Sequence, residues 1–313
     1  MAFYLVTGGA GFIGSHLAEA LLAGGNTVRV LDDLSSGRRE HVPDQCELQV
    51  GNVSDPAAVE QAVHGVDGCF HLAAIASVQR SVEDWRGTHL VNLTGTVTLF
   101  EAAAHARTGG PVPVVYASSA AVYGDNPDAP LAETARPAPL MAYAVDKLGC
   151  ELHATVASRV HGVPTTGFRL FNVYGPGQDA SSPYSGVISI FIDRILSGRP
   201  IEVHGDGESV RDFVFVKDAV RFLITGMETT DVGARVYNVC TGRATSITQL
   251  AEMSFAVCGR RVPVSHTSPR SGDIRYSLGA PDKAATELGV VADTTLRQGL
   301  VCTVRALGGA PSL

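Results

Sequence analysis

The sequence lacks the features that mark membrane proteins and nucleic-acid-binding proteins. No apolar run among its 313 residues is long enough to cross a bilayer, and no block of Lys and Arg interrupts a chain of net charge −7. A strand pattern begins at the N-terminus, so the sequence predicts no secretory signal. We therefore expect a cytoplasmic protein that has neither a membrane nor a nucleic acid as its partner.

Cysteine is also sparse, with six residues scattered along the chain and no C-x-x-C pair. The ten histidines show no metal-ligand spacing. These absences argue against a disulfide framework and predict no metal site. We expect the cysteines to be small buried residues in a reducing compartment, and His71, inside an apolar strand pattern, to be a core residue.

Strand and helix patterns alternate through the first half of the chain, which predicts an α/β fold with a doubly wound parallel sheet. The pattern changes after residue 172. We expect one domain over 1–172, to which later segments can return, and a smaller C-terminal α/β lobe over 173–313 that mainly binds substrate. Strands are expected to end near Val6, Asp32, Val50, Leu72, Ala117 and Arg169, with helices near 12–24, 55–64, 83–107 and 140–161.

A glycine-rich turn, Thr7-Gly-Gly-Ala-Gly-Phe-Ile-Gly14, joins the first apolar strand to the first helix. Glycines permit a tight turn and a close approach of the backbone to a pyrophosphate, whose charge is favoured at a helix N-terminus. Asp32 ends the second strand, where a carboxylate can accept hydrogen bonds from the adenosine ribose and would repel a 2′-phosphate. The pattern predicts a Rossmann domain that binds NAD rather than NADP.

A possible catalytic base lies further along the chain. Tyr143 and Lys147 are four residues apart in a helical pattern, so they share one helix face. A neighbouring ammonium favours the phenolate, which can act as a general base toward an alcohol. Ser119, at the end of a strand pattern, could bridge that alcohol and the phenol. We predict that Ser119, Tyr143 and Lys147 are catalytic.

Together, the glycine turn, Ser119 and the Tyr143-x-x-x-Lys147 pair resemble an extended short-chain dehydrogenase/reductase over nearly the whole chain. Segments 171–175, 205–213 and 270–273 are similar to the nucleotide-sugar branch, and most of all to the UDP-hexose 4-epimerases. The resemblance implies a homodimer built on helices near 83–107 and 140–161. It also implies that Asn172, Arg211 and Arg270 hold the UDP diphosphate and neighbouring groups, and that Asp273 binds the uridine ribose. Arginine offers the planar, multidentate donors that a diphosphate needs.

The resemblance also bears on the reaction. Related dehydratases and decarboxylases carry acidic residues after the active-site Ser or Thr, where this chain has Ala120 and Ala121. Without an acid or base there, elimination has no evident catalyst. We therefore expect simple C4 epimerisation, an isomerase reaction, through transient oxidation to a 4-keto sugar with NAD retained tightly.

One position and two segments indicate which sugar is the substrate. Ser277 stands where galactose-type epimerases have a bulky Tyr, which leaves room for a 2-acetamido group. Segments 76–81 and 178–188 resemble epimerases of UDP-N-acetylhexosamines. We predict a UDP-GlcNAc/UDP-GalNAc 4-epimerase. The alternatives are a UDP-glucose or UDP-glucuronate 4-epimerase, an NAD(P)-dependent nucleotide-sugar reductase, and a non-catalytic nucleotide-binding protein.

Two departures from the family pattern concern the site. Asp146 replaces the usual Ser or Thr before Lys147, and we expect it to lie on a different helix face from Tyr143. Asn52 replaces the acidic residue that usually contacts adenine, although an amide can still hydrogen-bond there.

The predicted site residues fall into two groups besides the catalytic three. The predicted cofactor-binding residues are Gly8, Gly11, Phe12, Ile13, Gly14, Asp32, Asp33, Leu34, Ser36, Gly37, Asn52, Val53, Leu72, Ala73, Ala74, Asn92, Tyr143, Lys147 and Phe171. The predicted substrate-binding residues are Ser77, Ser119, Tyr143, Asn172, Gly186, Val187, Val203, Arg211, Arg270, Asp273 and Ser277.

Overall fold

The computed structural model describes residues 1–76, 78–106, 109–180, 186–269 and 274–311 of the chain. The strands are β1 (Phe3–Thr7), β2 (Thr27–Asp32), β3 (Glu47–Val50), β4 (Gly68–His71), β5 (Val114–Ser119), β6 (Thr165–Leu170), β7 (Asn172–Tyr174), β8 (Ile201–His204), β9 (Val210–Arg211), β10 (Phe213–Phe215), β11 (Arg235–Val239), β12 (Thr245–Ser246), β13 (Val264–Thr267) and β14 (Tyr276–Ser277). The helices are α1 (Phe12–Ala23), α2 (Pro56–Val63), α3 (Val78–Glu83), α4 (Trp85–His89), α5 (Gly95–His105), α6 (Ala142–His161), α7 (Val187–Leu196), α8 (Val216–Thr229), α9 (Ile247–Cys258), α10 (Asp282–Glu287) and α11 (Leu296–Ala306), with short turns η1 (Arg39–His41), η2 (Leu90–Thr94) and η3 (Ala120–Tyr123).

The chain divides into two compact units, each assembled from segments that are far apart in the sequence. The first unit comprises Met1–Val122, Pro139–Arg169 and Val220–Tyr237. The second comprises Tyr123–Ala138, Leu170–Ala219 and Asn238–Leu313. The chain therefore passes several times from one unit to the other.

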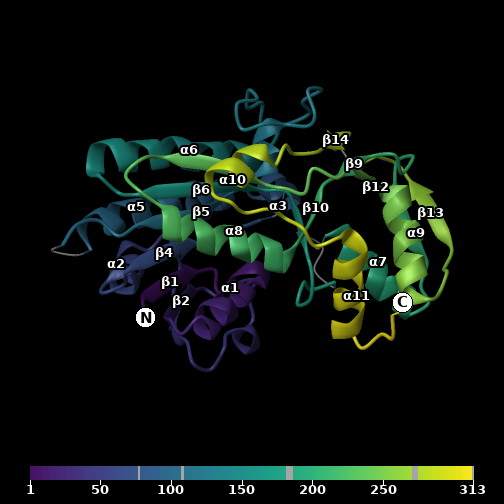
Figure 1. Ribbon diagram of the computed structural model, residues 1–313, viewed down its shortest axis with the longest axis horizontal. Helices are drawn as coiled ribbons and strands as arrows, with labels where there is room; N and C mark the ends of the chain where they lie inside the picture. Colours follow the sequence, from purple (N-terminus) through teal and green to yellow (C-terminus); the bar gives the residue numbers. More distant parts are fainter. Residues whose placement is uncertain (77, 107–108, 181–185, 270–273, 312–313) are drawn as a thin grey trace. The chain divides into compact units, whose positions relative to one another are not determined.

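A seven-stranded sheet in the order β11-β6-β5-β4-β1-β2-β3 forms the centre of the first unit (Figure 1). The pairs β1–β2, β1–β4, β2–β3 and β4–β5 are parallel. The order of the strands reverses between β1 and β4, and in sheets of this kind ligands bind at that point, outside the carboxyl ends of the strands. The predicted α/β class with a doubly wound Rossmann sheet is confirmed.

Most predicted elements of the first unit lie close to their observed positions, and one differs. The helix expected over 83–107 is interrupted: α4 starts after Asp84, whose carboxylate accepts a hydrogen bond from Gly87 N at 2.9 Å. A π-helical turn, η2, then connects α4 to α5. Asp84 ends the preceding helix α3 because its side chain caps the next one.

Helices cover the central sheet, and buried apolar side chains pack between the helices and the strands. A buried cluster joins β1, β4 and β5 to α2, α5 and α6, with Leu99, Phe100 and Ala154 among its members. Helix α8 crosses in front of the strands in Figure 1, and its Phe222 ring packs edge-on against Phe168 of β6 at 6.3 Å. Burial of such rings supplies much of the hydrophobic stabilisation.

The second unit is built from short parallel and antiparallel pairs. Strand β9 lies between β12 and β14, β7 pairs with β10, and β8 pairs with β13. Helices α7, α9 and α11 pack together beside them. Helix α9 begins with a capping box in which Ser246 and Gln249 exchange hydrogen bonds.

The described helices include none that is long and apolar enough to cross a membrane. All six cysteines are free, and five are buried as expected. The prediction is wrong for Cys302, which is exposed on α11, a helix that buries only its opposite face.

His71 is a core residue, as predicted, and it completes a chain of hydrogen bonds. Its Nδ1 lies 2.8 Å from Thr7 Oγ1, and its Nε2 lies 3.0 Å from Thr96 Oγ1. Thr7 Oγ1 accepts from Ala73 N, and Thr96 Oγ1 donates to the carbonyl of Asn92. These directions assign the neutral ring with its proton on Nε2. Burial, followed by the charge of Lys147, lowers the pKa of His71 to about 3.

The folded protein should therefore lose stability on acidification through His71. Its pKa is about 6.5 in an unfolded chain. Below that pH the unfolded state therefore binds a proton that the folded state does not bind. The contribution is fully present above about pH 6.5 and falls by up to about 1.4 kcal/mol per pH unit as the pH drops toward 3. His71→Gln should lose stability at neutral pH and show a shallower dependence between pH 6.5 and 4. Urea denaturation at several pH values would measure this, and parallel curves for the two proteins would contradict it.

Candidate active site

The glycine turn after β1 forms a close-packed cradle at the point where the strand order reverses. Gly8 has a left-handed φ of +70°, and a Cβ built on it would lie 2.6 Å from Ala73 N. A Cβ on Gly14 would lie 2.8 Å from Gly9 Cα and would overlap the carbonyl oxygen of Gly8. No side chain caps the N-terminus of α1 at Gly11. The Gly11 N–H donates to the carbonyl of Gly8 at 3.1 Å, whereas the N–H groups of Phe12, Ile13 and Gly14, in the first turn of α1, have no partner within the helix and could bind an anion.

Asp32 lies at the end of β2 and fixes the glycine turn. Its Oδ2 accepts a hydrogen bond from Ala10 N at 2.9 Å, and its Oδ1 accepts one from Leu34 N at 2.8 Å. Leu34 reaches this position with a left-handed φ of 56°. Burial raises the pKa of Asp32, and the two N–H donors oppose that rise. A carboxylate offers about four lone-pair positions, so two N–H bonds leave room for ribose hydroxyls.

The loop after β2 and the loop after β3 meet through side chains. Asn52 Nδ2 donates to Asp33 Oδ2 at 2.8 Å, and Asn52 Oδ1 accepts from Ser54 N. Gly37 packs so closely on Ala10 that a Cβ would lie 2.8 Å from its carbonyl carbon. Ser36 is exposed at this edge.

Three predicted cofactor residues contribute differently from the others. The side chain of Val53 is buried in the core, so its backbone alone could face a ligand. The buried amide of Asn92 binds both backbone groups of Ile75, through Ile75 N at 2.8 Å and its carbonyl at 3.1 Å. It thereby holds the loop that carries half-buried Leu72, Ala73 and Ala74. Phe171 is 5% exposed and belongs to the second unit, where it packs near Tyr123.

The first unit brings the three predicted catalytic residues to β5 and α6. Tyr143 and Lys147 lie one turn apart on α6, and Lys147 Nζ is 6.0 Å from the centre of the Tyr143 ring. Lys147 is 3% exposed, and its ammonium donates to the carbonyl of Ala117 on β5 at 2.8 Å. Ser119 ends the same strand, and its Oγ accepts a hydrogen bond from Ala121 N at 3.1 Å. The arrangement can place a cation beside a phenol next to a serine hydroxyl.

Asp146 is buried at 2% exposure, in the interior of the first unit, and Oδ1 lies 2.8 Å from Nδ1 of half-exposed His89. Its Oδ2 has no hydrogen-bond partner among the described residues. The residue therefore links α6 to α4.

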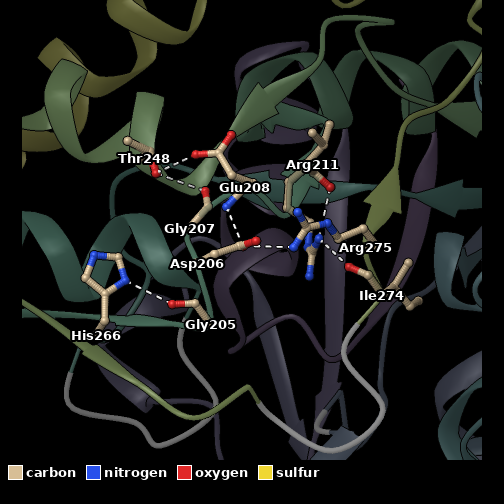
Figure 2. Close-up of polar contacts among 10 residues, drawn as sticks. Gly205, Asp206, Gly207, Glu208, Arg211, Thr248, His266, Ile274 and Arg275 are labelled. Atoms are coloured by element: carbon tan, nitrogen blue, oxygen red, sulfur yellow. Dashed lines mark hydrogen bonds and ion pairs between the residues drawn. The ribbon is translucent and has the colours of Figure 1, made fainter.

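The second unit collects predicted substrate residues around β9. Arg211 Nη1 donates to the carbonyls of Val210 and Ile274, at 2.9 and 2.7 Å (Figure 2). Half-buried Ser277 is the register partner of Arg211 across the parallel β9–β14 pair. Asn172 is exposed at the start of β7, and its N–H donates to the carbonyl of Asp212 at 3.0 Å.

The turn before β9 binds Arg275, a cation just before β14 to which the sequence assigned no role. Figure 2 shows Asp206 accepting from Arg275 Nη1 at 2.8 Å and from the backbone of Glu208. The N–H of Glu208, and then Arg275, lower the pKa of Asp206. Two features of the sequence could have predicted this ion pair, namely the Gly-Asp-Gly turn and the Arg two residues after Asp273. A pocket of about 560 Å³ is lined by His204, Gly205, Asp206, Ser209, Thr267, Pro269 and Arg275.

The remaining predicted residues are placed as follows. Gly186 caps the start of α7, Val187 is its first residue, and Val203 is buried on β8. Ser77, Arg270 and Asp273 lie outside the described residues. Within the described ranges, no group of three or more His, Cys, Asp or Glu side chains could hold a metal ion.

Comparison with known proteins agrees with this geometry. The model of the NAD dependent epimerase/dehydratase family matches residues 4–240. The chain belongs to this family. The UDP-glucose 4-epimerase of Mycolicibacterium smegmatis is 37% identical over 307 residues, which are 96% of each chain.

Two solved structures of similar proteins cover 98% of this chain and 98% of their own, both at 35% identity. The UDP-glucose 4-epimerase of Thermotoga maritima, solved with UDP-glucose, has a TM-score of 0.94. The UDP-N-acetylglucosamine 4-epimerase of Methanobrevibacter ruminantium, in complex with UDP-N-acetylmuramic acid, has a TM-score of 0.91. The predicted resemblance to extended short-chain dehydrogenases/reductases of the UDP-hexose 4-epimerase type is confirmed, and NAD is the cofactor of this epimerase/dehydratase family.

The first unit fits NAD on its own geometry. The turn at Gly8 and Gly14 leaves no volume for a side chain, and the buried Asp32 carboxylate retains acceptor positions.

The substitution Gly14→Ala should disrupt the NAD site of this family member. The new Cβ would overlap the Gly8 carbonyl, and overpacking of this kind costs about 1–3 kcal/mol, which corresponds to a dissociation constant for NAD about 5-fold to 150-fold higher where the cost falls on the bound state. Calorimetric titration of NAD into cofactor-depleted protein would measure the change. Gly109→Ala is the matched control because a Cβ there meets nothing within 4 Å. Equal NAD affinity in both variants would contradict the cradle.

Proposed function

We propose that the protein is a UDP-sugar 4-epimerase that interconverts UDP-GlcNAc and UDP-GalNAc with tightly retained NAD. The observation that carries the proposal is the buried ammonium of Lys147. It donates to the carbonyl of Ala117, two residues before Ser119, and Lys147 lies one helical turn from Tyr143. A neighbouring cation favours the phenolate, which is the base that removal of a proton from a secondary alcohol requires. The family membership supports the same reaction.

In the proposed mechanism Tyr143, as the phenolate, takes the proton of the C4 hydroxyl. Ser119 Oγ orients that hydroxyl, and Lys147 stabilises the negative charge of the phenolate and holds the nicotinamide ribose. When bound, NAD supplies the reversible oxidation at C4. The 4-keto sugar turns over while Asn172 and Arg211 hold the UDP moiety. Return of the hydride to the opposite face of C4, with Tyr143 returning the proton to the C4 oxygen, would give the other epimer.

The residues after Ser119 favour epimerisation over elimination. Ala120 and Ala121 form the η3 turn directly after β5, and neither can donate or accept a proton. A dehydratase would need an acid and a base at such a position to remove water across C5 and C6. Reduction of the oxidised sugar back to the alcohol is therefore favoured over elimination.

Ser277 supports the acetamido sugar within this proposal. It is small, half-buried and in register with Arg211, which is proposed to bind the diphosphate. A small side chain beside the substrate leaves volume for a 2-acetamido group. A UDP-glucose or UDP-glucuronate 4-epimerase is the second candidate, supported by the relatives named UDP-glucose 4-epimerase.

Purified protein should convert UDP-GlcNAc to UDP-GalNAc without consuming added NADH. Tyr143→Phe should lower kcat by orders of magnitude and leave UDP-sugar binding intact, because the lost hydroxyl acts only on the reacting proton. Product separation by liquid chromatography and absorbance at the nicotinamide band would measure both. Stoichiometric NADH consumption would identify a reductase instead.

The substrate choice is tested by Ser277→Tyr with UDP-GlcNAc and UDP-glucose side by side; Ser277→Ala is the control. The tyrosine should reduce kcat/KM for the acetamido sugar by about tenfold more than for UDP-glucose, the scale of a modest steric difference. Equal losses for the two sugars, or turnover of UDP-glucose or UDP-glucuronate alone, would rule out the acetamido assignment.

We also propose that the protein is a homodimer that pairs through α6. Val145, Leu152, Val156 and Val160 lie on one stripe of this helix and are 52%, 63%, 47% and 69% exposed. An apolar stripe of this length on a long helix is typical of a helix that packs against a second copy.

Replacing Leu152 and Val156 together with Glu should convert the dimer to monomers, because two charges would have to be buried in the interface. Sedimentation or light scattering would give the mass. Gln61→Glu, at an exposed position of α2, should leave the mass unchanged. A wild-type protein that is monomeric at micromolar concentration would refute the proposal.

A further inference from the structure

A buried ion pair lies behind the proposed catalytic residues of the first unit. Glu151 is one turn after Lys147 on α6 and is 7% exposed, and Arg169 on β6 is 5% exposed. Arg169 Nε donates to Glu151 Oε1 at 2.9 Å, and Arg169 Nη2 donates to Oε2 at 2.7 Å. This two-point contact fixes the plane of the carboxylate as well as its distance.

The carboxylate has a third partner on the strand that carries Ser119. Ser118 Oγ donates to Glu151 Oε1 at 2.5 Å, and Ser118 is 2% exposed. Ser118 lies between Ala117, whose carbonyl receives the Lys147 ammonium, and Ser119. Ala117 and Ser118 of β5 are thus hydrogen-bonded to α6, and the next residue, Ser119, is the one that orients the reacting alcohol in the proposed mechanism.

The charges of the ion pair also affect which partner Lys147 binds. Lys147 and Glu151 share one face of α6, so an unpaired carboxylate at Glu151 would compete with the Ala117 carbonyl for the lysine ammonium. The guanidinium of Arg169 occupies both carboxylate oxygens instead. Lys147 is thereby left with the carbonyl of Ala117, two residues before Ser119, and its ammonium lies 6.0 Å from the centre of the Tyr143 ring.

We propose that Glu151, held by Arg169 and bound to Ser118, is a positioning residue for Lys147 and Ser119. The proposal rests on the proposed epimerase function for its kinetic readout. Its geometric content is that loss of the Ser118 hydroxyl loosens the end of β5, while the ion pair and the fold persist.

The test compares Ser118→Ala with Ser118→Thr in the full chain. The alanine variant removes one hydroxyl and leaves Glu151 and Arg169 paired. We expect its kcat to fall by about tenfold with KM for the UDP-sugar changed less than about twofold, because a small misplacement of reacting groups costs rate rather than binding. The threonine variant keeps a hydroxyl at the same Cβ and should restore most of kcat.

A second measurement does not depend on turnover. Amide hydrogen exchange at Ala117, Ser118 and Ser119 should quicken in the alanine variant relative to the rest of β5, and should return to the wild-type rate in the threonine variant. If wild-type protein epimerises no UDP-sugar, the proposed function fails while this measurement still decides the positioning role.

Arg169→Lys provides a further variant with the same charge and without the two-point contact. It should reproduce the loss of kcat at unchanged KM. The proposal is overturned if folded Ser118→Ala and Arg169→Lys proteins keep kcat within about twofold, or if kcat falls equally in the alanine and threonine variants.

Discussion

The contact between the Lys147 ammonium and the carbonyl of Ala117 is the interaction on which the site depends. A buried ammonium is costly unless a polar group receives it, and here the receiving group belongs to the strand end that carries Ser119. The same contact therefore satisfies the charge and fixes helix α6 against β5. Glu151 and Arg169 neutralise each other one turn further on, so the interior tolerates three ionised side chains close to one another.

A second constraint is the close approach of backbones at the β1–β4 junction. Gly8 and Ala73 lie so near that a single Cβ would force them apart. The hydrogen-bond chain through Thr7, His71 and Thr96 fastens the same two strands from below and reaches Asn92, which holds the loop after β4. Every hydrogen of this chain is committed, which makes the neutral ring of His71 part of the architecture. These close contacts and hydrogen bonds define the shape of the glycine turn.

The second unit follows a different design. Its strands are short, and carbonyls and charged side chains at loop ends, such as Arg211 with Ile274 and Arg275 with Asp206, hold them together. The Arg275–Asp206 pair is exposed and contributes little to stability, whereas the Arg211–Ile274 hydrogen bond is partly buried.

The sequence by itself determined the alternating elements, the glycine turn, Asp32 and the Tyr143–Lys147 spacing, because these depend on local periodicity and on residue types with few conformational alternatives. It also predicted the buried state of His71 from its apolar neighbours.

The break at Asp84, the π turn at Leu90–Thr94 and the exposure of Cys302 were not visible, because side-chain capping and packing against other segments decide them. The burial of Asp146 against His89 was not visible either, because it depends on helix α4, which is distant along the chain. The ion pair of Glu151 and Arg169, the return of Val220–Tyr237 to the first unit and the engagement of Asn92 with Ile75 join residues that no spacing rule connects. Only tertiary structure decides such contacts, because the burial of a charge or an amide is settled by which distant group arrives to satisfy it.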